Sequence, residues 1–467
     1  MRKKIDSLVK NTILISAGGL IVKFLGALYR IPLNNVLKAE GLGIYQTAFP
    51  AYLILLTFSG ASATSAVTKI TASENRGEIV LKNSLKLILP VGIIGWLFMS
   101  LFSGILSSLQ GNPAARYSYI ALAPSLVFVS VISCIRGYFQ GKNDMKPTVV
   151  SQLTEQTVKI AAGLFLCYSF GSTSERGAFF ACAAVSLSEF AAMIYLVVKY
   201  GEKAEKQCDD RQKYPIKRLI AQLLPIALTS SIIPFARLFD SFTVVNVLKN
   251  YLDNATELYG LYSGSVESVV GMPVAVCYGI SASVLPGIAA AEAKGQRKTS
   301  ERLAIRAFSY TVFLSSIAFA FIALLPKPII SVLFSGLSPE NKLILTNLVS
   351  FSAINIVLLS VIQTETSVLV AKGKPFAPAL SLLFGFGLKA IAQLFLLKIP
   401  ALNVYGILYS DIICYFVAVF SNLVYIIFIY RPFYGKRKQK NEIISRRGGS
   451  NPGRLVAESS GTDENNG

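Results

Sequence analysis

Apolar runs of about 20 residues recur along the whole chain, and this is the length that a helix needs to cross a lipid bilayer. Hydrophobic residues make up 53% of the sequence and charged residues only 15%, a composition that excludes an ordinary soluble globular protein. The pattern predicts an all-α polytopic membrane protein with about twelve transmembrane helices. The predicted spans are roughly 11–36, 44–68, 84–108, 116–136, 148–170, 178–199, 219–248, 262–290, 304–325, 343–370, 376–398 and 405–430.

Basic residues are concentrated in every second predicted loop, which is the pattern that the positive-inside rule gives for cytoplasmic loops. The intervening loops 109–115, 171–177 and 399–404 carry few or none. We therefore expect a multi-pass protein with both termini in the cytoplasm. The basic clusters are the N-terminus, 69–86, 136–146, 199–218, 294–306, 372–374 and the segment after Tyr430.

The formal net charge of +20 does not indicate a nucleic-acid partner, because the basic residues lie in short loops beside apolar spans. Anionic headgroups of membrane lipids are the partners that such loops fit. The chain also contains no histidine, which excludes histidine-dependent catalytic triads and haem or zinc sites. Carboxylates and lysines are left to carry any proton transfer.

Short patterns that occur twice in the same order predict an internal duplication. Asn35–Lys38 returns as Asn246–Lys249, and Gly60–Ala63 returns as Gly279–Ala282. A duplicated six-helix unit has an even number of spans, so both copies enter the membrane from the same side. We expect two six-helix lobes related by a pseudo-two-fold axis along the membrane normal, with a substrate site near the midplane between them.

The longest polar stretch between predicted spans marks the boundary between the lobes. We expect an N-lobe with helices 1–6 at 1–200, a cytoplasmic linker at 201–217 and a C-lobe with helices 7–12 at 218–430. The segment 431–467 begins with basic residues and then becomes rich in Gly, Ser, Asn and acids. That composition predicts a disordered cytoplasmic tail.

Two cations, Lys23 and Arg30, lie inside the first apolar run, seven residues apart and so on one face of a helix. A charge at bilayer depth is costly unless it faces water, a partner or a ligand. A line of cations roughly 10 Å long suits an extended anion such as a pyrophosphate. Alternatively, Lys23 snorkels or pairs with an acid, and Arg30 reaches the outer interface. Lys69 is a third candidate, although membrane topology alone would also explain its charge.

A polar stripe marks the predicted fifth helix, where Gln152, Glu155, Gln156 and Lys159 share one face. Glu155 and Lys159 have the i,i+4 spacing of an internal ion pair. The stripe therefore either faces the central cavity and contacts substrate, or holds the helix in place through that ion pair. Glu189 in the predicted sixth helix is a further acid, and the sequence names no partner for it.

Acidic and basic residues are mixed within the spans of the second half. Arg237 and Asp240 lie one turn apart, so they either neutralise each other or act separately. Asp240, Glu365 and Asp411 are candidates for binding a coupling Na⁺ or H⁺, because a carboxylate in a membrane cavity can bind either. For Glu365 and Asp411 the alternative is hydrogen bonding between helices. The other charges within these spans are Glu267 and Lys389.

Several motifs within residues 1–430 occur together: Lys23–Gly26 with Arg30, Glu40–Tyr45, Ser65–Lys69, Arg136–Gly141, Gln152 with Glu155–Gln156, Asp240–Phe242 and Pro286. This set resembles the lipid-linked oligosaccharide flippases of the stage V sporulation protein B and MurJ type, within the multidrug/oligosaccharidyl-lipid/polysaccharide (MOP) exporter superfamily. The resemblance implies an MOP/MATE-like fold, with two lobes around a cationic cavity that opens alternately to each side. It also implies that Lys23, Arg30 and Lys69 are the cavity cations that bind a lipid-linked pyrophosphate.

We interpret the chain as a flippase of the bacterial cytoplasmic membrane that exports a lipid II-like cell-wall or polysaccharide precursor. We expect a monomer that needs no cofactor, with Na⁺ or H⁺ as the candidate coupling ion. A cation-coupled multidrug exporter of the same fold is the main alternative, and it would favour an acidic cavity. A membrane enzyme acting on the same lipid is disfavoured by the missing histidines, the absence of an Asp-x-Asp metal motif and the short loops.

Overall fold

The computed structural model describes residues 2–73, 77–203 and 216–430, and every regular element in these ranges is helical. The predicted tail and most of the predicted linker lie outside the described residues. The elements are α1 (Arg2–Ser59), α2 (Ala61–Ser73), α3 (Gly77–Leu101), α4 (Ser103–Leu109), η1 (Pro113–Ala115), α5 (Arg116–Leu122), α6 (Ser125–Gly141), α7 (Lys146–Phe170), α8 (Ser174–Lys203), α9 (Ile216–Ser230), α10 (Ile232–Leu248), α11 (Ala255–Gly260), η2 (Leu261–Val266), α12 (Glu267–Ala293), α13 (Arg297–Leu324), α14 (Pro326–Leu333), α15 (Pro339–Ser352), α16 (Ile354–Ala371), α17 (Phe376–Leu396) and α18 (Tyr405–Tyr430).

The first helix, α1, is broken near its middle. Its 58 residues would extend far beyond the thickness of a bilayer if they formed one straight helix. The break falls at Lys38, whose backbone angles of φ 58° and ψ −171° are not helical. A residue with a Cβ is strained at positive φ. The break at Lys38 lies between the end of the first predicted span and the start of the second.

The helices α9 and α10 form a bent pair, with an angle of 44° between them at Ser231. Pro234 lies in the first turn of α10 and has no N–H to donate to the carbonyl of Ser230. The backbone therefore loses one helical hydrogen bond at the bend. A single predicted span, 219–248, thus becomes two helices with different directions.

Each of the twelve predicted spans lies largely in helix. Within the described residues, however, nine helices are long and apolar enough to cross a membrane, or ten if α9 and α10 form one span. Two features reduce twelve to ten: the first two predicted spans join into one candidate, Phe24–Ser73, and α7 with its polar stripe is not among the candidates. The count is nine when the bent pair α9 and α10, the predicted span 219–248, is left out. The chain is a multi-span helical membrane protein.

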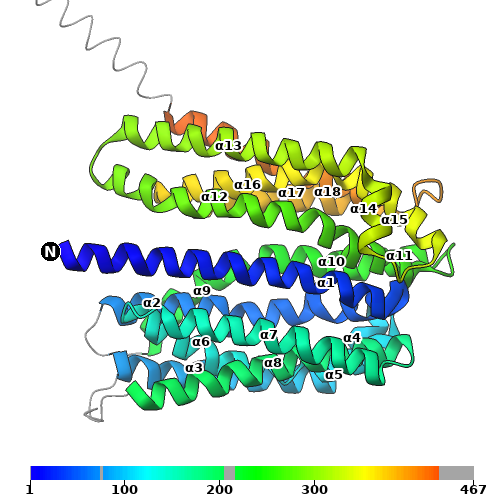
Figure 1. The fold of residues 1–467 in the computed structure, drawn as a ribbon, viewed down its shortest axis with the longest axis horizontal. Coiled ribbons are helices and arrows are strands. Elements are labelled where there is room, and N and C mark those ends of the chain that lie inside the picture. The colour runs from blue at the N-terminus through cyan, green and yellow to red at the C-terminus, as the bar shows by residue number, and fades with distance from the viewer. Residues whose placement is uncertain (1, 74–76, 204–215, 431–467) are drawn as a thin grey trace, which may run out of the picture. The chain divides into compact units, whose positions relative to one another are not determined.

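Residues Met1–Asn422 form one compact unit, within which α1 contacts helices of both halves of the sequence. In the first half α7 packs on α8, and both α2 and α3 pack on α6. In the second half α12, α13 and α16 pack on one another. Figure 1 shows α1 running between these two sets, and it contacts α7 and α8 on one side and α10, α11 and α12 on the other. The helix α9 follows the predicted linker but packs on α2 and α3 of the first half.

Reciprocal contacts between the halves agree with the predicted duplication. Asn35 donates from Nδ2 to the carbonyl of Leu333, at 2.9 Å, at the end of α14. Asn246, its counterpart in the repeated pattern, donates from Nδ2 to the carbonyl of Leu109, at 2.7 Å, at the end of α4. Each asparagine thus contacts the corresponding helix end of the opposite half, as expected for lobes related by a pseudo-two-fold axis.

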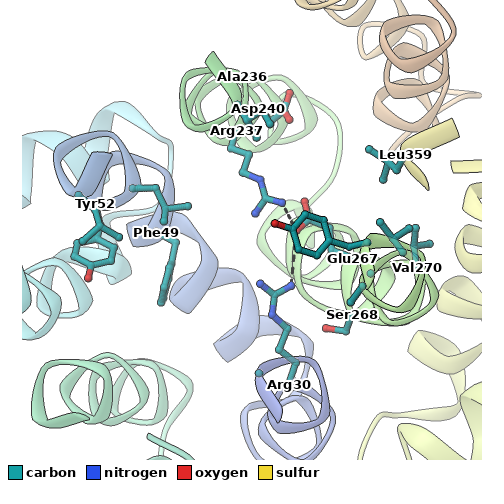
Figure 2. Close-up of a pocket in the computed structure, with 18 of the residues that line it drawn as sticks. Arg30, Phe49, Tyr52, Ala236, Arg237, Asp240, Glu267, Ser268, Val270 and Leu359 are labelled. Atoms are coloured by element: carbon teal, nitrogen blue, oxygen red, sulfur yellow. Dashed lines mark ion pairs between the residues drawn. The ribbon is translucent and has the colours of Figure 1, made fainter. Parts of the chain in front are cut away.

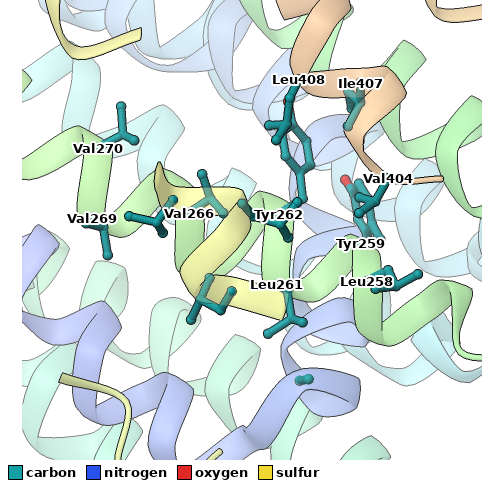
Figure 3. Close-up of a cluster of buried hydrophobic side chains, with 14 of the residues drawn as sticks. Leu258, Tyr259, Leu261, Tyr262, Val266, Val269, Val270, Val404, Ile407 and Leu408 are labelled. Carbon is teal, nitrogen blue, oxygen red and sulfur yellow. The ribbon is translucent and has the colours of Figure 1, made fainter. Parts of the chain in front are cut away.

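A cluster of buried apolar side chains holds the second half together around α11, η2 and the start of α12 (Figure 3). Leu261 and Val266 come from the single π-helical turn η2, and both are at most 3% exposed. Ile407 and Leu408 from α18 pack into the same cluster, and neither is exposed. This packing fixes Glu267, the first residue of α12, at the edge of the core.

Candidate functional site

A cavity of about 730 Å³ lies between the two halves. Its walls come from α1, α7 and α8 on one side and from α10, α12, α16, α17 and α18 on the other. This volume is in the range of small-molecule binding sites. The cavity is lined by apolar and aromatic side chains and by the charged residues Arg30, Glu155, Lys159, Glu189, Arg237, Asp240, Glu267, Lys389 and Asp411.

Two arginines from opposite halves converge on one carboxylate in this cavity (Figure 2). Arg237 on α10 places Nη2 at 3.1 Å from Oε2 of Glu267, and Arg30 on α1 places Nη1 at 3.8 Å from the same oxygen. The two arginine side chains are 42% and 40% exposed, so both guanidinium groups remain open to the cavity. The group carries a net positive charge.

A second charged cluster lies deeper in the wall of the cavity. Lys389 on α17 places Nζ at 2.7 Å from a carboxylate oxygen of Asp240 and at 2.7 Å from one of Asp411. Tyr262 donates its hydroxyl to the other oxygen of Asp411, at 2.6 Å. All three charged side chains are at most 7% exposed. This triad carries a net negative charge and ties α10, α17 and α18 together.

The polar stripe of α7 contributes to the cavity through Glu155, Gln156 and Lys159. Of the two alternatives for this stripe, the ion pair between Glu155 and Lys159 is not found, and Glu155 accepts from Nη2 of Arg136 on α6, at 3.2 Å. Lys159 makes no ion pair within the described part of the chain, and it lines the cavity. Gln152 lies on the same helix but does not line this cavity in the described structure.

Of the two alternatives for Arg237 and Asp240, the structure shows separate partners, although the two residues lie one helical turn apart. Arg237 pairs with Glu267 and Asp240 pairs with Lys389. The physical reason is that the two residues contact different neighbouring helices, because Glu267 belongs to α12 and Lys389 to α17. Adjacency along one helix did not decide the pairing.

The remaining predicted site residues lie away from the arginine pair or outside the described structure. The side chain of Lys23 lies outside the described residues. Lys69 is exposed and donates to Gln222 of α9, at 2.8 Å, and it does not line the cavity described above. Glu365 on α16 is 2% exposed and is likewise absent from the described lining. Their roles in binding stay predictions.

The structure shows the surroundings of four charged residues that the sequence did not assign to the site: Arg136, Glu189, Glu267 and Lys389. Their occurrence within or at the ends of apolar spans was visible, but the sequence did not indicate the partners of Lys389, which lie on helices far away in the sequence. Lys389 and Asp240, for example, are separated by 149 positions. Glu189 is 8% exposed, lines the cavity, and its Oε2 has no hydrogen-bond partner among the described residues.

One end of the interface between the halves is closed by close backbone packing of α1 against α11 and η2. A Cβ added to Gly43 would overlap the carbonyl oxygen of Thr256, and one added to Gly260 would overlap that of Ala39. Gln46 donates to the carbonyl of Ser263 at 3.1 Å along the same seam. The predicted topology places this seam on the side away from the cytoplasm, so the halves are in contact there.

Known proteins resemble this chain in both sequence and structure. Stage V sporulation protein B of Bacillus subtilis (strain 168) is 26% identical over 309 residues, which cover 61% of this chain and 58% of that protein. The matched region thus spans less than two thirds of that relative. Lipid II flippase MurJ of the same strain is 20% identical over 425 residues, covering 84% of this chain and 78% of that protein.

Solved structures show the fold. An inward-facing multidrug resistance MATE family transporter of the MOP superfamily matches with a TM-score of 0.73 at 17% identity, over 86% of this chain and 93% of the other. A MOP superfamily transporter from Pyrococcus furiosus, described as having a binding pocket of reverse polarity, matches with a TM-score of 0.64 at 14% identity, over 90% and 95% of the two chains. The fold is therefore that of the MATE transporters.

The family follows from the sequence itself. A model of the polysaccharide biosynthesis protein family matches residues 8–292, which is more than half of the chain and includes most of α1, all of α7 and α10, and nearly all of α12. The match therefore includes both arginines of the cavity and the glutamate that they share. The chain belongs to the polysaccharide biosynthesis protein family.

Proposed function

We propose that this protein translocates an undecaprenyl-pyrophosphate-linked cell-wall or polysaccharide precursor across the bacterial cytoplasmic membrane by alternating access. The observation that supports this most is the pair Arg30 and Arg237, which come from opposite halves and meet in the cavity. A guanidinium group matches the oxygens of a phosphate with two parallel hydrogen bonds. Two such groups match the two phosphates of a pyrophosphate.

The relatives point in the same direction, since one of them is named a lipid II flippase and the family is one of polysaccharide biosynthesis. In the proposed cycle the arginines hold the pyrophosphate while the two halves move relative to each other. Lys23 and Lys69 are the further cations that we propose contact the substrate in part of the cycle. The protein would work as a transporter and as a monomer, in contact with anionic lipids through its basic loops.

We propose that a coupling ion or the membrane potential resets the cycle. Asp240, Asp411 and Glu365 are the candidate carboxylates in the second half. Asp240 and Asp411 both contact the ammonium group of Lys389, so a Na⁺ or H⁺ would have to compete with that lysine for them. Glu365, by contrast, has no ion pair within the described residues, and both of its carboxylate oxygens are buried.

The test is binding of an undecaprenyl-pyrophosphate-linked muropeptide to the purified full chain, measured by native mass spectrometry. The Arg30→Ala/Arg237→Ala variant should weaken binding at least about a hundredfold, because each hydrogen bond to a charged group contributes roughly 1.5–3 kcal/mol. Lys142→Ala is the matched control, since this cation pairs with Glu78 at 3.4 Å outside the cavity. Binding that survives the double substitution would contradict the proposed site.

A cation-coupled multidrug exporter of the same fold is the second candidate, and the acids Glu189, Asp240 and Asp411 in the cavity wall favour it. Such an exporter would bind a lipophilic cation such as ethidium. Charge reversal by Arg30→Glu should leave ethidium efflux from cells intact or increase it. The flippase proposal expects no efflux, and loss of muropeptide binding in the same variant.

A further inference from the structure

The arrangement of Arg30, Arg237 and Glu267 leaves both arginines incompletely bound. Each guanidinium contacts the carboxylate through one nitrogen, and both contact the same oxygen, Oε2. A guanidinium fork is best satisfied by two oxygens in a bidentate geometry. The remaining donors of both forks therefore stay available to a ligand in the cavity.

The same carboxylate also keeps two like charges together across the interface between the halves. Arg30 belongs to α1 and Arg237 to α10, and without an anion between them the two guanidinium groups would repel each other. Glu267 is 26% exposed in its side chain, which is enough for water to reach it. An ion pair in contact with water is held weakly, so the carboxylate can be exchanged for another anion.

Glu267 lies where an anion would be bound. Its Oε2 occupies the point on which both arginines converge, and Figure 2 shows the two guanidinium groups directed at it from opposite sides. A pyrophosphate offers several anionic oxygens and would satisfy both forks at once. A single carboxylate offers two oxygens, of which one is used here.

We propose that Glu267 is an internal stand-in for the anionic group of the substrate, and that the substrate's pyrophosphate displaces it from Arg30 and Arg237. This proposal rests on the proposed function. It identifies Glu267 as a residue that sets the affinity of the site for the pyrophosphate. In the empty protein Glu267 keeps the two arginines in place. After transport it competes with the bound pyrophosphate and so favours release.

The consequence is that removing the charge of Glu267 should strengthen binding, although a salt bridge is lost. The Glu267→Gln variant keeps the shape of the side chain but no longer competes for the arginines. We expect undecaprenyl pyrophosphate to bind about three- to tenfold more tightly, because a solvent-accessible ion pair is a weak competitor. A purely structural role would give unchanged or weaker binding.

The experiment measures the affinity of undecaprenyl pyrophosphate for the full chain by native mass spectrometry in four proteins: wild type, Glu267→Gln, Glu155→Gln and Arg30→Gln/Arg237→Gln. Glu155→Gln is the matched control, since it removes the same charge from the same cavity but at a carboxylate that pairs with Arg136. A thermal melt of each variant shows that it is folded.

The proposal expects tighter binding in Glu267→Gln alone. Equal gains in Glu267→Gln and Glu155→Gln would overturn it, because the effect would then come from the net charge of the cavity. Unchanged or weaker binding in Glu267→Gln would also overturn it. In both cases the proposed function survives if the arginine double variant loses binding, whereas a wild-type protein that does not bind the lipid overturns both.

Discussion

The triad of Asp240, Lys389 and Asp411 gives the most quantitative prediction. Lys389→Met keeps most of the side-chain volume but removes the only positive charge of the triad. The net charge of these three positions then changes from minus one to minus two, in a place where the carboxylates are 5–7% exposed. Two like charges remain, with little water to screen them.

The expected cost follows from this burial. Removing one partner of a buried ion pair costs about 3–5 kcal/mol, because the other partner stays buried and uncompensated. An unfolding entropy of about 2.1 cal/mol/K per residue gives about 1 kcal/mol/K for 467 residues. The melting temperature should therefore fall by about 3–5 °C.

The double variant Asp240→Asn/Lys389→Met tests the reasoning, because it restores the net charge of minus one and leaves Asp411 with its hydrogen bond from Tyr262. It should recover part of the lost stability, because one uncompensated carboxylate stays buried where Lys389→Met leaves two. The assay is thermal unfolding in detergent, followed by the reaction of a maleimide dye with buried free cysteines such as Cys414. The reasoning is refuted if Lys389→Met melts with the wild type, or if the double variant melts as low as Lys389→Met.

Two further predictions concern the closed end of the interface between the halves. Asn35→Ala removes two hydrogen bonds across this interface and Asn246→Ala removes one, so they should destabilise the contact by about 1–3 and about 0.5–1.5 kcal/mol respectively, and the two effects should add because the sites are separate. Maleimide labelling of single cysteines introduced along α11 measures the opening, and no change in either variant would contradict the proposed symmetry of the contacts. Gly43→Ala should open the same seam more strongly, because its new Cβ would overlap the carbonyl of Thr256. Gly271→Ala is the control, since a Cβ at that position meets nothing within 4 Å, and it should leave cysteine labelling unchanged.

The positions of the membrane spans could be predicted from the sequence because a span depends on local composition. The twelve apolar ranges, and the repeated pattern at Asn35 and Asn246, are evident in the order of the amino acids alone. The breaks are evident there only in part. Pro234 indicates a bend in its span, but the positive φ of Lys38 depends on how α1 packs against both halves.

The charged site could be predicted only as a set of residue types. That Arg30, Arg237, Asp240 and Asp411 lie inside apolar spans follows from the sequence, and it identifies them as residues that need a partner. Spacing along one helix suggested partners for two of the acids, Glu155 and Asp240, and in both cases the structure pairs the acid with a different helix.

The sequence by itself determined that this chain crosses a membrane many times, that its halves are related and that charges lie within its spans. Those properties depend on composition and on the periodicity of single helices. Only the tertiary structure decided that Arg30 and Arg237 share Glu267 and that Lys389 lies between two aspartates. The physical reason is that such pairings depend on the rotation and bending of helices far apart in the sequence, which no local pattern records.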